Sequence, residues 1–188
     1  DSTISSYHDD WALDTVTPGV VYNGDFEQGS LAGFSKPTTS YVTASINTDI
    51  VHGGTYSAKL VTSNNGWTTG RYFNDVEVEQ DTDYLWSLWV YFESVPANSG
   101  GSLGGFGVTT TADVAITTSL DELTYDDGSV TLGDAMLLEW IIPVKPPATI
   151  GEWHKYDISF NSGVNSKVRL NYVNYNSETV SYLDDWKL

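Results

Sequence analysis

The feature that most constrains this chain is a repeated alternation of apolar and polar residues, broken by turn residues every ten to fifteen positions. A period of two places apolar side chains on one face of a β-strand, and many short strands separated by turns are typical of a β-sandwich. No segment carries a helical apolar stripe longer than two turns. We therefore predict an all-β fold, a sandwich of two antiparallel sheets with little helix. The predicted strands are 41–47, 55–62, 72–78, 84–92, 137–143, 156–160, 168–175 and 180–188.

The alternation begins at Val20, which divides the chain into two parts. Residues 1–19 show no sustained periodicity and end on a Pro-Gly turn, so we expect an N-terminal extension or linker. Residues 20–188 are expected to form a single β-sandwich module, because a chain of 188 residues can bury roughly 70% of its unfolded surface. We expect neither a transmembrane helix nor a signal peptide. We therefore expect a mature or excised fragment.

Acidic side chains outnumber basic ones by 25 to 8, which gives a formal net charge of −17 at pH 7. Such a chain lacks the cationic surface that nucleic acids and anionic membranes require, so neither is expected as a partner. Charge repulsion also argues against a strongly acidic polysaccharide as ligand. The chain contains no cysteine, which removes thiol chemistry and leaves the redox compartment open.

Carboxylates gather near both ends of the predicted sandwich. A strand expected over residues 20–26 carries Asp25, and Glu27 after it, on the face opposite its apolar side chains. In the last strand, alternation places Asp184 on the same face as Trp186, and a carboxylate beside a core tryptophan is costly unless it is paired or bound to a metal. If the strand at 20–26 and the strand at 180–188 lie side by side, these three carboxylates could converge on Ca²⁺, which takes oxygen ligands. Ordinary exposed acids at strand ends are the alternative.

Two predicted strands carry more outward-facing side chains of a binding type than a core requires. The core face of the fourth strand is complete with Tyr84, Trp86, Leu88, Val90 and Phe92. Trp89 and Tyr91 therefore point the other way, and in the seventh strand Arg169, Asn171 and Tyr175 do the same. Aromatic rings beside Arg, Asn and Glu suit a neutral sugar, because the apolar side of a pyranose stacks on the ring while its hydroxyls form hydrogen bonds. Simple aromatic cover of an outer sheet face is the alternative.

Three further residues are candidates for the same sugar site. Trp67 and Arg71 flank a loop where a binding edge could form, and Glu139 lies on the face opposite the apolar side chains around it. The Gly-rich stretch between residues 94 and 111 is expected to be a mobile loop, and 125–129 a hairpin turn.

Four short motifs follow one another in a familiar order. They are NGDFEQG at 23–29, HGGTYSAKL at 52–60, DYLWS at 83–87 and LDDW at 183–186. Together they resemble the jelly-roll carbohydrate-binding modules of families 4, 9 and 22, over roughly residues 20–188. The resemblance implies a jelly-roll sandwich and a structural calcium held by Glu27 and Asp184, with Asp25 as a further candidate. Backbone carbonyls near His52-Gly53 and Lys59 would complete its oxygen ligands.

The resemblance also implies a function. The expected module is non-catalytic and monomeric, and it targets a secreted polysaccharide-degrading enzyme to a neutral plant or algal β-glycan of the β-glucan or xylan type. Its expected partners are a polysaccharide or oligosaccharide and the covalently linked modules of a larger chain. A structural or adhesive β-sandwich domain of a cell-surface protein, without sugar binding, is the alternative.

An enzyme is not expected. Glu77 and Glu79 share one strand face, as paired carboxylates do in some sandwich glycosidases. The tighter Glu/Asp/Glu arrangement amid apolar residues of jelly-roll glucanases is absent, however, and the three histidines are scattered. Solvated acids at a hairpin edge explain Glu77 and Glu79 better.

Overall fold

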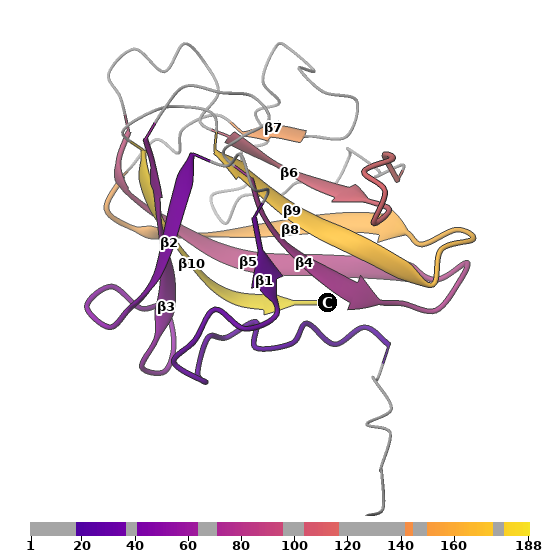
Figure 1. The fold of residues 1–188 in the computed structure, drawn as a ribbon, viewed down its shortest axis with the longest axis horizontal. Helices are drawn as coiled ribbons and strands as arrows, with labels where there is room; N and C mark the ends of the chain where they lie inside the picture. The colour runs from indigo at the N-terminus through magenta and orange to yellow at the C-terminus, as the bar shows by residue number, and fades with distance from the viewer. Residues whose placement is uncertain are drawn as a thin grey trace, which may run out of the picture.

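The computed structural model describes residues 18–36, 41–63, 71–95, 104–116, 142–144, 150–174 and 179–188. These residues form two layers of β-strands (Figure 1). Across the described ranges there is no helix, and so none long and apolar enough to cross a membrane. Most of the predicted extension, the hairpin at 125–129 and the candidates Trp67, Glu139 and Tyr175 lie outside the described residues.

The strands form two five-stranded sheets. In spatial order, sheet A consists of β1 (Phe34–Ser35), β4 (Arg71–Glu77), β9 (Lys167–Asn174), β6 (Gly104–Thr109) and β7 (Ile142–Val144). Sheet B consists of β2 (Val42–Asn47), β3 (Ser57–Thr62), β10 (Val180–Lys187), β5 (Asp83–Ser94) and β8 (Trp153–Asn161). All neighbouring strands pair antiparallel. The predicted all-β sandwich of two antiparallel sheets is therefore confirmed.

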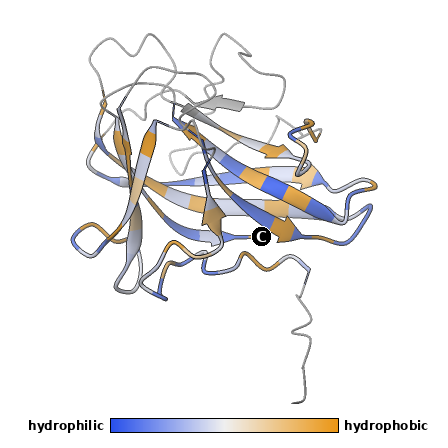
Figure 2. Cartoon of the chain, viewed as in Figure 1, coloured by the Kyte–Doolittle hydropathy of each residue, from blue (hydrophilic) through white to orange (hydrophobic). Residues whose placement is uncertain are grey.

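The inner faces of the two sheets meet in an aromatic core. The ring centroids of Trp86 and Trp186 lie 5.1 Å apart, and Phe106 packs 4.7 Å from Tyr156. The predicted registers of β5 and β9 are confirmed, because Trp86, Leu88, Val90, Phe92, Val168, Leu170 and Tyr172 are all buried. Figure 2 shows the alternation as bands of opposite hydropathy along the strands of sheet A.

The opening strand expected at 20–26 is wrong. Asn23 and Phe26 have φ angles of 52° and 57°, in the left-handed region that strands do not use. Turn hydrogen bonds run from Phe26 N to Asn23 O (3.1 Å) and from Gly29 N to Phe26 O (2.9 Å). The apolar residues of this segment are consequently not on one face: Phe26 is fully buried, whereas Val20 and Tyr22 are exposed.

The expected mobile loop between residues 94 and 111 contains a strand of sheet A. β6 pairs with β9 on one side and β7 on the other. Phe106 and Val108 are buried in the core, while Gly105 and Gly107 alternate with them on the outer face. Glycine lacks the side chain that would have marked the outer face, and the period of two was therefore hidden in a Gly-rich sequence.

The expectation that Asp184 and Trp186 share one face of the last strand is wrong. The pairing of β10 with β5 shifts register between Asp184 and Lys187, and Asp185 has a φ of 51°. This β-bulge turns one residue out of the strict alternation. Trp186 faces the core, and Asp184 lies on the outer face, opposite Trp89.

Candidate functional site

Two of the predicted sugar-binding residues come together on the outer face of sheet A. Arg71 opens β4, and Asn171 lies in the neighbouring strand β9. Arg71 Nε donates a 2.6 Å hydrogen bond to Asn171 Oδ1. Because side chains alternate along β4, Phe73 and Asp75 share the face with Arg71. Asn171 was predicted from its outward position in the strand at 168–175, and Arg71 from its place beside the loop that contains Trp67.

A second arginine completes a charge network on this face. Arg169 forms a bidentate ion pair with Asp75, with nitrogen–oxygen distances of 2.6 and 3.0 Å. Asp113, in the turn after β6, accepts from Arg71 Nη2 at 2.5 Å and from Arg169 Nη1 at 2.9 Å. These are the only two arginines in the sequence. We call Arg71, Phe73, Asp75, Asp113 and Arg169 the arginine face.

The guanidinium groups also flank an aromatic ring. The Cζ atoms of Arg169 and Arg71 lie 4.1 and 4.9 Å from the centroid of the Phe73 ring. Such cation–π contacts fix the guanidinium planes, which leaves less side-chain entropy to lose on ligand binding. Asp113 is 47% exposed and Arg169 15%, so solvent reaches the network at these side chains.

Ionisation on this face is set by the ion pairs. The hydrogen bond from Arg71 is the largest influence on Asp113, and it keeps the pKa of that carboxyl below its ordinary value. The hydrogen bond to Asp75 raises the pKa of Arg169. The network pairs two arginines with two aspartates, so it offers both donors and acceptors without a formal net charge.

Asn171 is a buried residue that holds this network in place through hydrogen bonds. Its side chain is fully buried, and its Nδ2 lies within hydrogen-bonding distance of Gly107 O (3.1 Å), Thr109 Oγ1 (3.2 Å) and Arg169 O (3.0 Å). Its Oδ1 accepts from Arg71. The predicted role of Asn171 in sugar binding is therefore best assigned as holding Arg71 in place.

Trp89 and Tyr91 do not join the arginine face, because β5 belongs to sheet B. Trp89 stacks on His52 at 3.9 Å with an interplanar angle of 18°. Tyr91 contacts the rings of Trp153 and Tyr182, each at 5.7 Å. We call these five residues the aromatic row: His52, Trp89, Tyr91, Trp153 and Tyr182. The two groups of predicted sugar-binding residues thus lie on the two opposite outer faces of the sandwich.

The sequence reasoning missed several members of both groups. Phe73 and Asp75 alternate with Arg71, a signal that was available. Asp113 carried no signal, because a turn of sheet A brings it to the arginines from 42 and 56 positions away. Trp153 is the first residue of β8 and contacts His52 as well as Tyr91.

The carboxylates proposed as calcium ligands lie near the 52–56 loop. Glu27 Oε1 accepts hydrogen bonds from the backbone N–H groups of Thr55 and Tyr56, at 2.8 and 2.9 Å. A Cβ atom on Gly54 would lie 2.3 Å from the same carboxylate, so the loop approaches Glu27 as closely as only glycine allows. Glu27 therefore fixes one side of this loop.

Asp184 fixes the other side of the loop. Its Oδ2 accepts from the backbone N–H groups of His52 and Gly53, at 3.0 and 3.2 Å, and its Oδ1 accepts from Asp185 N at 2.8 Å. Only 1% of the residue is exposed, and burial raises the pKa of Asp184 to about 6, against the lowering effect of these hydrogen bonds. A buried carboxylate of this kind is one that a bound cation would stabilise.

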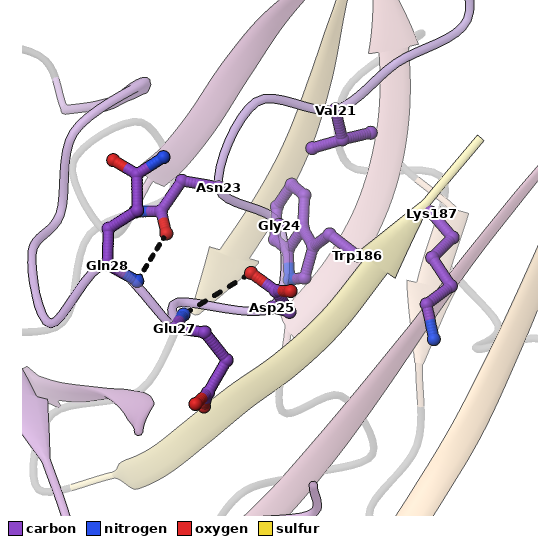
Figure 3. Close-up of a pocket in the computed structure, with 8 residues that line it drawn as sticks. All are labelled: Val21, Asn23, Gly24, Asp25, Glu27, Gln28, Trp186 and Lys187. Carbon is purple, nitrogen blue, oxygen red and sulfur yellow. Dashed lines mark hydrogen bonds between the residues drawn. The ribbon is translucent and has the colours of Figure 1, made fainter. Parts of the chain in front are cut away.

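Asp25 lines an open pocket of which Asp184 is not part. The other residues that line it are Val21, Asn23, Gly24, Glu27, Gln28, Trp186 and Lys187 (Figure 3). There Glu27 N donates to Asp25 Oδ1 at 3.3 Å. Among the described residues no three His, Cys, Asp or Glu side chains gather into a metal cluster. The oxygen chemistry of Glu27 and Asp184 fits calcium, but side chains would supply at most a minority of its ligands and backbone carbonyls the rest.

Comparison with known proteins gives one family match and several similar structures. The family described as "Carbohydrate binding domain" (CBM_4_9) matches residues 18–179. The xylan-binding CBM22-1 domain of Paenibacillus barcinonensis Xyn10C superposes with a TM-score of 0.52 at 14% identity, covering 92% of this chain and 96% of that one. No curated protein sequence matched.

Two other solved structures share the fold. TmCBM61, solved in complex with β-1,4-galactotriose, has a TM-score of 0.52 at 14% identity and covers 91% of this chain and 97% of its own. A CBM4 structure has a TM-score of 0.53 at 11% identity, with 89% and 97% covered. Similarity at these identities establishes the shared β-sandwich fold.

Proposed function

The chain belongs to the carbohydrate binding domain family, and from this we propose that it is a non-catalytic module that binds a neutral β-glycan on the arginine face of sheet A. The observation that carries the proposal is the network in which Arg71 and Arg169 share Asp113 beside the Phe73 ring. Guanidinium groups donate to sugar hydroxyls, carboxylates accept from them, and the ring offers an apolar edge. The balanced charges suit a ligand without charge of its own.

The proposed ligand is of the β-glucan or xylan type. The net charge of −17 opposes binding of an acidic polysaccharide. The similar structures include one described as xylan-binding and one in complex with β-1,4-galactotriose, which are neutral β-linked ligands. We infer the same class of ligand for this chain, as part of a secreted polysaccharide-degrading enzyme with further covalently linked modules.

Affinity electrophoresis tests this function. The protein is run through gels that contain xylan, a mixed-linkage β-glucan, a β-1,4-galactan or polygalacturonate. We expect a neutral glycan to retard the protein, without release of reducing sugar when the two are incubated together. Retardation only by polygalacturonate would contradict the ligand class, and release of reducing sugar would contradict a non-catalytic role. No retardation by any glycan would favour a structural or adhesive domain of the same fold.

We also propose that one structural calcium ion binds between Glu27 and Asp184 at the 52–56 loop. The buried Asp184 carboxylate and the close approach of Gly54 to Glu27 support this position. A ligand that binds only the folded state raises the melting temperature. EDTA should therefore lower the melting temperature of the wild type, and the Asp184→Asn variant should not respond. A wild-type melting temperature unchanged by EDTA would contradict calcium binding.

A further inference from the structure

The aromatic row lies on the outer face of sheet B, away from the arginine face. Tyr182 on β10, Tyr91 on β5 and Trp153 on β8 occupy paired outward positions across three neighbouring strands. Trp89 lies two residues from Tyr91 on the same face of β5. His52 reaches the row from the 52–56 loop and contacts Trp89 and Trp153 at 3.9 and 5.6 Å. The rings therefore contact one another across three strands, and because Tyr182 is only 2% exposed, the rings that reach solvent are those of His52, β5 and β8.

These rings are not needed for the core. Trp86, Leu88 and Phe92 already fill the inner face of β5, and the row belongs to the other face. Trp89, Tyr91 and Trp153 are each half-buried, so part of every ring reaches solvent. His52 covers one face of Trp89. A half-exposed ring surface of this kind is suited to stacking on the apolar side of a flat ligand.

Charged side chains flank the row in pairs. On one side Lys59 lies 3.4 Å from Glu93, and Tyr182 OH donates to the same carboxylate at 2.6 Å. On the other side Lys155 lies 2.9 Å from Asp157, which also accepts from Ser87 Oγ. These two cations and two anions are paired with one another, although the chain as a whole carries −17, and Asp185 lies 2.7 Å from His52 of the row.

Rings bordered by charge-balanced donors and acceptors fit a neutral glycan better than a charged partner. A nucleic acid or acidic peptide would need unpaired cations, and both lysines beside the row are already paired. We propose that the aromatic row is a second glycan-binding surface, for the same class of neutral β-glycan as the arginine face. This inference rests on the proposed function, which concerns the arginine face alone.

Two binding surfaces on opposite faces would let one protein bind two separate glycan chains. The faces point away from each other, so one short oligosaccharide cannot occupy both. Each protein should bind two oligosaccharides, and with long polysaccharides it should join separate chains. Such cross-linking increases apparent affinity for a polymer without any new contact.

The test is the binding stoichiometry of a short ligand. The probe is whichever of xylohexaose, cellohexaose and β-1,4-galactohexaose binds the 188-residue protein most tightly in isothermal titration calorimetry. We expect two hexasaccharides per protein for the wild type. The double variant Tyr91→Ala/Trp153→Ala should bind one. The matched control Leu85→Ala changes an exposed residue on the same face of β5 but outside the row, and it should still bind two.

The outcomes separate this inference from the proposed function. One hexasaccharide per wild-type protein, lost in Arg169→Ala and unchanged in Tyr91→Ala/Trp153→Ala, would overturn the second surface and leave the arginine face standing. No binding of any of the three probes would overturn both. Because the wild-type stoichiometry alone decides the question, the inference stays falsifiable even if the double variant does not fold.

Discussion

Arg71 is the residue on which the arginine face depends most directly. It uses Nε to bind Asn171 and Nη2 to bind Asp113, so one side chain joins β9 to the turn after β6. Only 6% of the residue is exposed, and its position is therefore fixed before any ligand arrives. A preformed arrangement loses little entropy on binding, which favours weakly interacting ligands such as sugars.

Replacing Arg71 by lysine should weaken glycan binding without unfolding the protein. Lysine keeps the charge but has one nitrogen, which cannot reach Asn171 and Asp113 in the same planar arrangement. We expect the dissociation constant to rise about tenfold, or about 1.4 kcal/mol. The control Lys167→Gln alters a charge at the far end of the same sheet face, where Lys167 pairs with Glu77. Equal affinities for all three proteins, measured by calorimetry, would show that Arg71 has no part in binding.

Asp113 should make the stability of the fold depend on acid. The hydrogen bond from Arg71 lowers the pKa of Asp113 below its ordinary value of 3.8. A carboxyl with a lowered pKa contributes stability above its unfolded value, and the contribution is lost as the pH falls through the folded value. The free energy of unfolding, measured in urea, should thus fall more steeply below about pH 4 for the wild type than for Asp113→Asn. The exposed control Asp49→Asn should follow the wild type, and identical slopes for Asp113→Asn and wild type would contradict this role.

At the scale of elements, strand β5 shows how alternation separates stability from binding. Neighbouring residues point to opposite faces, so Trp86 is fully buried while Leu85 is 50% exposed. Trp86 also contacts the rings of Trp186 and Phe106 across the core. A single strand thus contributes to the core on one side and to the aromatic row on the other.

Adjacent substitutions in β5 should therefore differ greatly in effect. Trp86→Ala should lower the free energy of unfolding by about 3 to 5 kcal/mol, because it removes a buried aromatic side chain and leaves a cavity. Leu85→Ala should change it by less than about 0.5 kcal/mol, as exposed substitutions usually do. Chemical denaturation measures both. A similar loss for the two variants would mean that the register of β5 is different.

The 52–56 loop forms hydrogen bonds with both Glu27 and Asp184, and Gly54 makes its closest approach to Glu27. Gly54 and Gly163 both have positive φ angles, of 65° and 54°, but a Cβ atom would meet Glu27 at the first and nothing within 4 Å at the second. Gly163→Ala should cost about 1 to 2 kcal/mol for the left-handed backbone alone. Gly54→Ala should cost more, because the Glu27 carboxylate must also move. Equal losses in denaturation midpoints would show that Glu27 does not hold the loop.

Most strands could be predicted because their residues alternate over six or more positions. Prediction failed where that signal was altered locally. Glycines hid the outer face of β6, left-handed residues turned the segment at 23–26 away from strand geometry, and a bulge at Asp185 exchanged the faces near the end of β10. The last two failures each involve one or two backbone conformations that the side-chain pattern does not encode, and the first arises because glycine has no side chain.

For the whole molecule, the sequence predicted which side chains face outward but not which sheet carries them. Arg169 and Trp89 were both correctly placed on outer faces, yet β9 and β5 belong to different sheets. Sheet membership depends on pairing between strands far apart in the sequence, such as β4 with β9 and β10 with β5. For that reason one predicted sugar site divides into two surfaces in the folded protein.

The net charge of the molecule and the paired charges of the arginine face both favour an uncharged ligand. An uncharged ligand should bind with an affinity that barely changes with salt, since screening over about 8 to 10 Å weakens only interactions between charges. This separates a neutral glycan from a uronate, for which Arg71 and Arg169 would be the attracting groups.

The most direct test of the central claim is an NMR titration of the ¹⁵N-labelled protein with xylohexaose and cellohexaose. Backbone and arginine Nε signals of Arg71, Phe73, Asp113 and Arg169 should shift progressively with at least one of them, and equally at low and high salt. Signals of Val42 and Ala44 in β2, the edge strand of sheet B at the opposite end from β8, should not move. Shifts that leave all four arginine-face residues unchanged, or that vanish at high salt, would contradict the proposal that this face binds a neutral β-glycan.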